Sequence, residues 1–290
     1  NRHQNLPKYA GLVKDMDWTG EVRCHPELVE QPLHWSTPRR VFVCSTSDLF
    51  HSKVPWSFLI KVFRIMERSP RHTFQILTKR PGRMAYFAEH IWPDSVQMAG
   101  LGQINRRWPP NVWAGTSVES QKFAPRLDCL VRVPAKVRFV SVEPMLGPVD
   151  LSSYFFKCAH EGKGVCNCQG LAVNWVIVGG ESGPGARPMH PAWARSLRDD
   201  CQAAGVPFFF KQRGEWTWEG DGVDDVLADQ ADFCIPLDWK RHPDRYQFLE
   251  SDGSQGTGYD GGRGVFVAKV GKKAAGALLD GREWREWPSA

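Results

Sequence analysis

The stretch Asn174–Trp193, NWVIVGGESGPGARPMHPAW, predicts the fold, because a strand, a polar loop and the start of a helix follow one another within it. Its apolar run WVIV is typical of a strand that is buried on both faces, as in a parallel sheet. Pro191 suits the first turn of a helix, and Gly205 suits the left-handed position just past its end. The stretch therefore reads as one strand–loop–helix unit.

The same order of elements recurs along most of the chain. Apolar runs predict seven strands, at 20–24, 40–44, 73–77, 111–116, 137–140, 174–178 and 207–210. Amphipathic stretches predict helices between them, at 55–68 and 191–204, and with a weaker pattern at 83–91 and 121–131. This alternation predicts an α/β fold of the (β/α) barrel type. A doubly wound open sheet is the alternative, because an eight-stranded barrel needs one more strand.

Composition and charge exclude several classes of protein. The chain has 290 residues, of which 42% are hydrophobic and 24% charged, so it is not a disordered or fibrous protein. No apolar run is long enough to span a bilayer, and no signal segment opens the chain. Eight Cys residues are too sparse for a disulfide scaffold. We therefore expect a protein of the cytoplasm with no membrane partner, and the net charge of +5 permits an anionic one.

The last quarter of the chain has a different character. An acidic stretch at 215–232 and a stretch rich in Gly and Ser at 251–264 replace the strand–helix alternation. We expect two domains: a barrel at 1–213, and a C-terminal extension at 214–290 that packs on it.

Polar clusters follow nearly every predicted strand. They are CHPE (24–27), CSTSDLFH (44–51), TKRP (78–81), TSVE (116–119), SVEP (141–144), GGESGPGARPMH (179–190) and KQRGEW (211–216). A parallel sheet presents these strand ends at one edge, which is where active sites of barrels form. The series as a whole predicts a polar cleft, whereas a single Ser within it is better explained as a cap of the next helix.

Two further motifs each leave two interpretations open. In GGESGPG, the glycines either let backbone N–H groups approach a ligand, with Glu181 suited to an ammonium group or a ribose hydroxyl, or form a plain tight turn. Cys158, His160, Cys166 and Cys168 fall within eleven residues and are candidate zinc ligands. Their C-x-H-x5-C-x-C spacing is not the usual paired C-x2-C, so thiols of an insertion loop are the competing interpretation. None of the eight Cys forms the three-thiolate run of a [4Fe–4S] site.

Taken together, these stretches resemble a family of phage-encoded proteins, also found in bacterial genomes, that is grouped with the radical S-adenosylmethionine (SAM) enzymes. The matching stretches are HPELVEQPLHW, RRVFVCSTSDLFH, HTFQILTKRP, NVWAGTSVE, VRFVSVEPMLGPVDL, NWVIVGGESGPGARPMHPAW, AAGVPFFFKQRGEW and GKKAAGALLDGREW. The resemblance implies a (β/α) barrel of the radical SAM type. Family members carry a Cys…Cys-x2-Cys loop before a helix that resembles Asn1–Tyr9, so we expect the first strand and the cluster loop upstream of residue 1.

The resemblance also implies an activity and a set of cofactor-binding residues. A [4Fe–4S] cluster would cleave SAM, and the resulting radical would abstract hydrogen from a small-molecule or nucleotide substrate, such as a nucleic-acid base. Lys79 and Arg80 are candidates for the SAM carboxylate; Glu119, Glu143 and Glu181 for its ammonium or ribose; Ser47 and Asp48 for SAM or substrate. GGE-like segments of radical SAM enzymes lie near the second strand, so that role is not transferred to the late GGE here.

The alternative function is a non-catalytic nucleic-acid-binding protein of a phage, on a degenerate barrel. Two basic segments suggest this alternative: Arg106–Arg107 and Lys240–Arg245, which stand beside Trp108 and Trp239. Iron content and release of 5′-deoxyadenosine would favour the enzyme, and tight salt-dependent DNA binding without either would favour this alternative.

Overall fold

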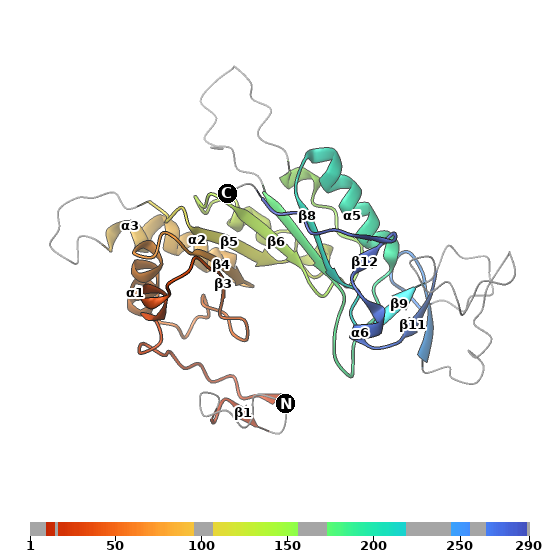
Figure 1. Cartoon of the computed structure of the whole chain (residues 1–290), viewed down its shortest axis with the longest axis horizontal. Helices are drawn as coiled ribbons and strands as arrows, with labels where there is room; N and C mark the ends of the chain where they lie inside the picture. Colours follow the sequence, from red (N-terminus) through yellow and green to blue (C-terminus); the bar gives the residue numbers. More distant parts are fainter. Residues whose placement is uncertain are drawn as a thin grey trace, which may run out of the picture.

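Six parallel strands form the central sheet of the computed structural model (Figure 1). They are β3 (Arg40–Val43), β4 (Thr73–Thr78), β5 (Val112–Ser117), β6 (Arg138–Val142), β7 (Trp175–Gly179) and β8 (Phe208–Gln212). Their order in the sheet is their order in the chain, and the sheet curls into half of a barrel. The structure describes residues 10–14, 17–95, 107–155, 173–218, 245–255 and 265–288.

The sheet confirms six of the seven predicted strands and their parallel pairing, including that of β4 with β5. Strands placed in chain order leave no point where the order reverses, so the doubly wound alternative is wrong. The predicted strand at 20–24 is also wrong, because this segment forms no ladder with another part of the described chain. Val22 and Cys24 alternate toward the core, which explains the pattern, but alternation does not by itself supply the main-chain hydrogen bonds of a strand.

Helices connect the strands much as the apolar periodicity predicts. The two strong patterns form α1 (Trp56–Glu67) and α5 (Pro191–Ala204), and Gly205 ends α5 at φ 66°. The weaker pattern at 83–91 begins earlier, as α2 (Pro81–Tyr86), continues as a π-helical turn η3 (Phe87–Ile91) and ends in α3 (Trp92–Asp94). The pattern at 121–131 is split into the 3₁₀ turn η5 (Gln121–Phe123) and α4 (Arg126–Leu130), because Pro125 cannot continue the preceding turn.

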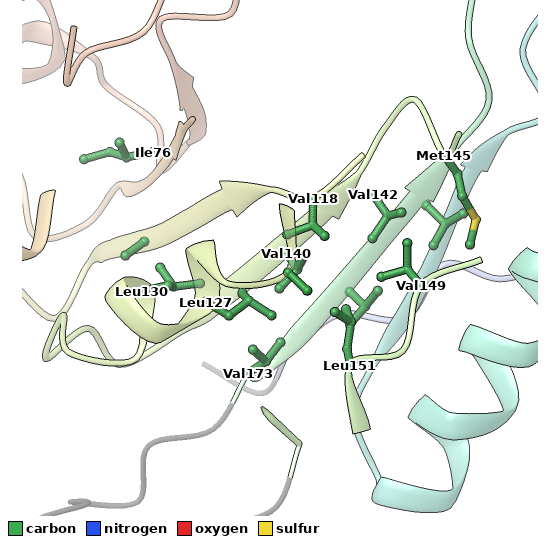
Figure 2. Packing of buried hydrophobic residues seen from close by; sticks show 14 of the residues in the cluster. Ile76, Val118, Leu127, Leu130, Val140, Val142, Met145, Val149, Leu151 and Val173 are labelled. Carbon is green, nitrogen blue, oxygen red and sulfur yellow. The ribbon is translucent and has the colours of Figure 1, made fainter. Parts of the chain in front are cut away.

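The two faces of the sheet bury different sets of side chains. The outer face packs against the helices, where Leu127 and Leu130 of α4 meet Val140 of β6 (Figure 2). The opposite face, which we call the inner face, carries a separate cluster built on Trp113, Phe139 and Trp175. Alternation along each strand therefore divides the sheet into a helix-covered side and an inner side. Within the described residues, no helix has the length and apolar character needed to cross a membrane.

The described C-terminal residues form short antiparallel strands and one short helix. An antiparallel sheet joins β10 (Tyr246–Leu249), β11 (Val265–Lys269) and β9 (Trp216–Trp218). The other described elements are β1 (Val13–Lys14), β2 (Asp17–Trp18), the 3₁₀ turns η2 (Gln31–His34) and η6 (Ser152–Tyr154), α6 (Lys272–Ala275), β12 (Leu278–Leu279) and β13 (Arg282–Glu283). The boundary at residue 213 stays a prediction.

The C-terminal tail links the two edge strands of the half-barrel. The backbone N–H of Phe210 in β8 donates to the carbonyl of Trp284 at 2.9 Å. Trp287 packs on Trp175 with 4.6 Å between ring centroids, and Arg40 of β3 lies 4.4 Å over the Trp287 ring. Because β3 and β8 are opposite edges, the tail spans the half-barrel at the end where the strands begin.

A buried histidine, His190, caps the start of α5. The Ala192 N–H donates to His190 Nδ1 at 3.1 Å, and His190 Nε2 is buried with no partner in the described chain. Burial, followed by the charge of Arg195, lowers the pKa of His190. The unfolded chain therefore binds this proton more readily, so stability should be intact above about pH 6.5 and fall as the pH drops below it.

We expect His190→Asn, which keeps an acceptor at the helix start, to reduce this loss of stability. The measurement is the change in melting temperature between pH 7.5 and 5.5. His34→Asn, at an exposed position, is the control and should behave as the wild type does. An undiminished pH effect in His190→Asn would contradict the assignment.

Candidate functional site

Asp48 organises the polar edge where β3 and β4 end. Its Oδ1 accepts from the Thr78 hydroxyl at 2.7 Å and from the Phe50 N–H at 2.9 Å. Its Oδ2 accepts from the Arg80 guanidinium at 2.7 Å and from the Lys79 N–H at 3.2 Å. Asp48 thus holds the backbone and side chains around it, and both of its oxygens are already engaged.

A second carboxylate, Glu119, follows β5 and binds two cations. Its Oε1 lies 2.5 Å from Lys79 Nζ, and its Oε2 lies 2.9 Å from Arg126 Nη1. The Glu119 side chain is 7% exposed, whereas that of Lys79 is 60% exposed. Burial acts to raise the pKa of Glu119, but the hydrogen bond from Lys79, a backbone hydrogen bond and the two cations outweigh it, so the pKa is lowered. Glu119 is therefore a fixed anion that holds Lys79 at the polar edge.

Glu143, which follows β6, is paired across the sheet with β8. Lys211 Nζ lies 2.9 Å from Glu143 Oε2, and the Gln212 amide donates to Oε1 at 3.3 Å. The same Gln212 amide donates to the carbonyl of Gly180 at 2.9 Å. Lys79 and Glu143 thus belong to two separate pairs and do not bind each other.

Glu181 is occupied by its own loop. Arg187 donates to it through Nε and Nη2, each at 2.7 Å, and through its backbone N–H at 2.8 Å. The hydrogen bond from Arg187 is the largest cause that lowers the pKa of Glu181. This pairing favours a structural role for Glu181 in closing the Gly-rich loop.

The glycines of this loop serve a close crossing of two backbones. A Cβ on Gly180 would lie 1.8 Å from the carbonyl oxygen of Arg213, and one on Gly214 would lie 2.2 Å from that of Glu181. Glu215 adds to the crossing, because its backbone N–H donates to the Glu181 carbonyl at 2.9 Å. The segments GGE and RGE are thus glycine-rich where one chain packs on the other, and the packing interpretation explains Gly180 without a ligand.

Below the charged pairs, the inner face offers polar groups that are free. Ser117 of β5 and Ser141 of β6 are neighbours in the sheet register and point to the inner face. In the described chain neither hydroxyl has a hydrogen-bond partner. Leu77 and Ile177 flank them, each half-buried on the same face. Further down β4, Gln75 Nε2 is buried and has no partner among the described residues.

The structure brings most of the predicted residues to one edge. One continuous network joins Asp48, Lys79, Arg80 and Glu119. Ser47 precedes Asp48 in the chain, and its N–H donates to the Cys44 carbonyl at 3.1 Å. Burial raises the pKa of the Cys44 thiol, to which Ser47 also hydrogen-bonds. Glu143 and Glu181 lie toward β7 and β8.

Sequence reasoning missed five residues: Gln75, which lies inside the predicted strand at 73–77, and Arg126, Lys211, Ser117 and Ser141. Lys211 and both serines stood in quoted strand-end segments, so only their partners and orientation were lacking. Arg126 is the first residue of α4, and no local sequence signal marks it as part of the site.

Two other predictions concern residues elsewhere. Cys158, His160, Cys166 and Cys168 lie outside the described residues; within the described ones, no group of three His, Cys, Asp or Glu is placed to hold a metal. Trp108 is a core residue, 5% exposed, with its Nε1 donating to the Val112 carbonyl at 2.8 Å, so its ring is not available to a nucleic acid bound at Arg106–Arg107. Arg106, Trp239 and most of Lys240–Arg245 also lie outside the described residues.

Comparison with protein families gives one match. The sequence model of a family described as a protein of unknown function (DUF5131) matches residues 2–288. The chain belongs to this family. Searches of curated proteins and of solved structures gave no match. In this DUF5131 chain, the match includes every strand-end residue from Ser47 to Glu215 as well as the C-terminal tail.

Proposed function

We propose that this DUF5131 chain is a radical-SAM-like enzyme that binds SAM on the inner face of its half-barrel, with a nucleotide or nucleic-acid base as the substrate. The observation that supports SAM binding is the pair of ion pairs, Lys79–Glu119 and Lys211–Glu143, at the edge where the strands end. Both cations are more than half exposed on their side chains, so each is accessible to an anionic group of a ligand.

The donor set suits a ligand that carries both charges. Lys79 and Lys211 offer ammonium groups to a carboxylate, whereas Glu119 and Glu143 offer carboxylates to an ammonium group. The free hydroxyls of Ser117 and Ser141 suit a ribose. These groups match the amino-acid and sugar parts of SAM, and charged partners at both ends would orient it along the sheet.

The inner face also suits the base of a nucleoside. Leu77, Ile177 and Phe209 are half-buried apolar side chains on this face. The partnerless amide of Gln75 is a donor for a ring nitrogen, and an unmade hydrogen bond of this kind costs free energy until a ligand makes it. Gln75 and Lys79 are four residues apart along an extended chain, about 13 Å. That separation matches an extended nucleoside with an amino-acid tail.

The described residues do not fit a [4Fe–4S] cluster. Their thiols are Cys24, Cys44, Cys129 and Cys201, and no three of these or other ligands gather. The role that we propose for the described residues is to bind SAM, to orient it and to keep its base out of water.

Lys79→Ala tests this proposal. We expect it to weaken SAM binding about tenfold, which lies at the low end of the range for a lost charged hydrogen bond because Lys79 is largely exposed. The measurement is a calorimetric titration of the full chain with SAM, together with a melting curve. Lys136→Ala is the control, since Lys136 is exposed and precedes β6 at the far end of the sheet.

The alternative explanation is that Lys79 only neutralises the charge of Glu119 and does not bind SAM. In that case Lys79→Ala would lower the melting temperature and leave the affinity for SAM unchanged. A wild-type chain that shows no heat of binding with SAM would contradict the proposal outright.

A further inference from the structure

Three side chains, of which Tyr86 is exposed, stack on one another beside the polar edge. Arg83 of α2 lies 3.7 Å over the ring of Trp56, the first residue of α1. Tyr86, one turn further along α2, packs against the same ring with 5.9 Å between centroids. Tyr86 is 50% exposed, the highest value among the exposed large hydrophobic and aromatic residues of the described chain. Its ring also lies 4.8 Å from that of His90, which is exposed as well.

Arg83 is a cation with no anion beside it. Its Nη2 donates to the Val54 carbonyl at 2.6 Å, while its Nε is buried and has no partner in the described chain. No ion pair of Arg83 occurs among the described residues, and its pKa is lowered by burial and by the nearby charge of Arg80. The neighbouring Arg80 is paired with Asp48, whereas Arg83 has no such pair in the described chain, so its positive charge is left for an outside partner.

Other basic groups extend this charge. Lys53 has a side chain that is 55% exposed; its Nζ donates to the Gly20 carbonyl at 3.0 Å, and in the described chain its ion pair is with Glu21 at 3.9 Å. Lys53 directly precedes Val54, whose carbonyl accepts from Arg83 Nη2. Burial and the charges of Arg80, Lys53 and Arg83 lower the pKa of the nearby His51, although the charge of Asp48 acts to raise it. The stack and the cations thus form one surface.

We propose that this surface, made of Lys53, Trp56, Arg83, Tyr86 and His90 and called here the Tyr86 surface, binds a single-stranded nucleic acid. The exposed Tyr86 ring offers a platform on which a base stacks, and Arg83 and Lys53 offer charge to the adjacent phosphates. Arg83 lies on the Trp56 ring and is therefore held in place before the strand arrives.

A nucleic-acid strand fits these features better than the other anions. Inorganic phosphate would use the cations but not the exposed ring. An acidic peptide would use the cations too, but its carboxylates do not stack on Tyr86. Protein surfaces that bind single-stranded nucleic acids combine an aromatic ring, on which a base stacks, with cations that are free to bind phosphates. Tyr86 and Arg83 provide this combination.

This inference rests on the proposed function. It narrows the class of substrate to a base within a single-stranded nucleic acid. Arg80 connects the two sites, because it caps α2 and binds Asp48 at the polar edge. A strand held on the Tyr86 surface would therefore lie next to the SAM-binding edge.

The test is fluorescence anisotropy of the full chain with a 5′-labelled twelve-nucleotide oligothymidylate at several salt concentrations. We expect binding that weakens with salt, with a log–log slope that becomes shallower by about 0.7 in Arg83→Gln. Tyr86→Ala should weaken binding about 5- to 150-fold, the range for one lost stacking contact, whereas Tyr86→Phe should keep most of the affinity.

Controls separate this surface from general charge and from the SAM site. Lys136→Gln removes an exposed charge at the other end of the sheet and should leave the affinity for the oligonucleotide nearly unchanged. Melting curves show whether each variant is folded, and Lys53→Gln, at an exposed position, repeats the charge test if Arg83→Gln does not fold. SAM affinity, measured on the same preparations, should not change in Tyr86→Ala.

Three outcomes would overturn the inference. One is a wild-type chain that binds no oligonucleotide, even if it binds SAM, in which case the proposed function still stands. Another is wild-type affinity in Tyr86→Ala. The third is displacement of the oligonucleotide by an equal concentration of oligoglutamate, which would indicate an acidic-peptide surface. Oligonucleotide binding without SAM binding would instead support the surface and contradict the proposed function.

Discussion

Gly180→Ala should lower the free energy of unfolding by about 3 kcal/mol, the upper part of the range for overpacking. The added Cβ would lie 1.8 Å from the Arg213 carbonyl oxygen, and backbone atoms cannot move aside as the end of a side chain can. The Gly180 N–H also donates to the Gln212 carbonyl at 2.8 Å, so a shift would break a hydrogen bond of the crossing. For a chain of this size, we expect the melting temperature to fall by about 6–12 °C.

A matched control lies in the same loop. A Cβ on Gly185 would meet nothing within 4 Å, and the backbone there is not left-handed. Gly185→Ala should therefore change stability by no more than about 0.5 kcal/mol. If the two variants melt at the same temperature, the close crossing is not what requires glycine at position 180.

The second large effect is expected from Glu119→Gln. The change removes the charge that Lys79 and Arg126 share, and it leaves Arg126 partly buried without an anion. Removing one partner of a buried ion pair lowers the free energy of unfolding by about 3–5 kcal/mol. Because Lys79 is exposed, we expect a smaller loss here, of about 2–3 kcal/mol. Glu89→Gln is the control, because Glu89 pairs with Arg132 at an exposed site where an ion pair contributes about 0–1 kcal/mol.

The effect of Glu119 should also depend on pH. Its pKa is lower in the folded chain than in the unfolded one, so its contribution is complete above about pH 4.5 and is lost as the pH falls through the folded value. The difference in unfolding free energy between the wild type and Glu119→Gln should therefore be large at pH 7 and shrink below pH 4.5. Urea unfolding at pH 7 and pH 4 measures it, and an equal difference at both would show that the charge of Glu119 is not the cause.

Local patterns determined the strands and helices of this protein. Apolar runs such as WVIV and VRFV form strands because both faces of the sheet exclude water, and the sequence shows that requirement directly. Pro191 and Gly205 bound α5 because each residue has the backbone conformation that its position needs. The same patterns placed Lys79, Glu119 and Glu143 at one edge, since parallel strands end together.

Tertiary structure alone decided which of these residues bind each other. Lys79 pairs with Glu119 on the adjoining strand and Glu143 pairs with Lys211, a choice set by strand order and by the curl of the sheet. Gly180 is required by a carbonyl that is 33 positions further along the chain, so its neighbours in sequence carry no sign of it. The segment at 20–24 alternates as a strand does but pairs with no strand among the described residues. Short-range sequence encodes burial and backbone conformation, whereas contacts between distant segments depend on how the whole sheet curls. The ion pairs, the glycine crossing and the tail across the half-barrel are all contacts of this second kind.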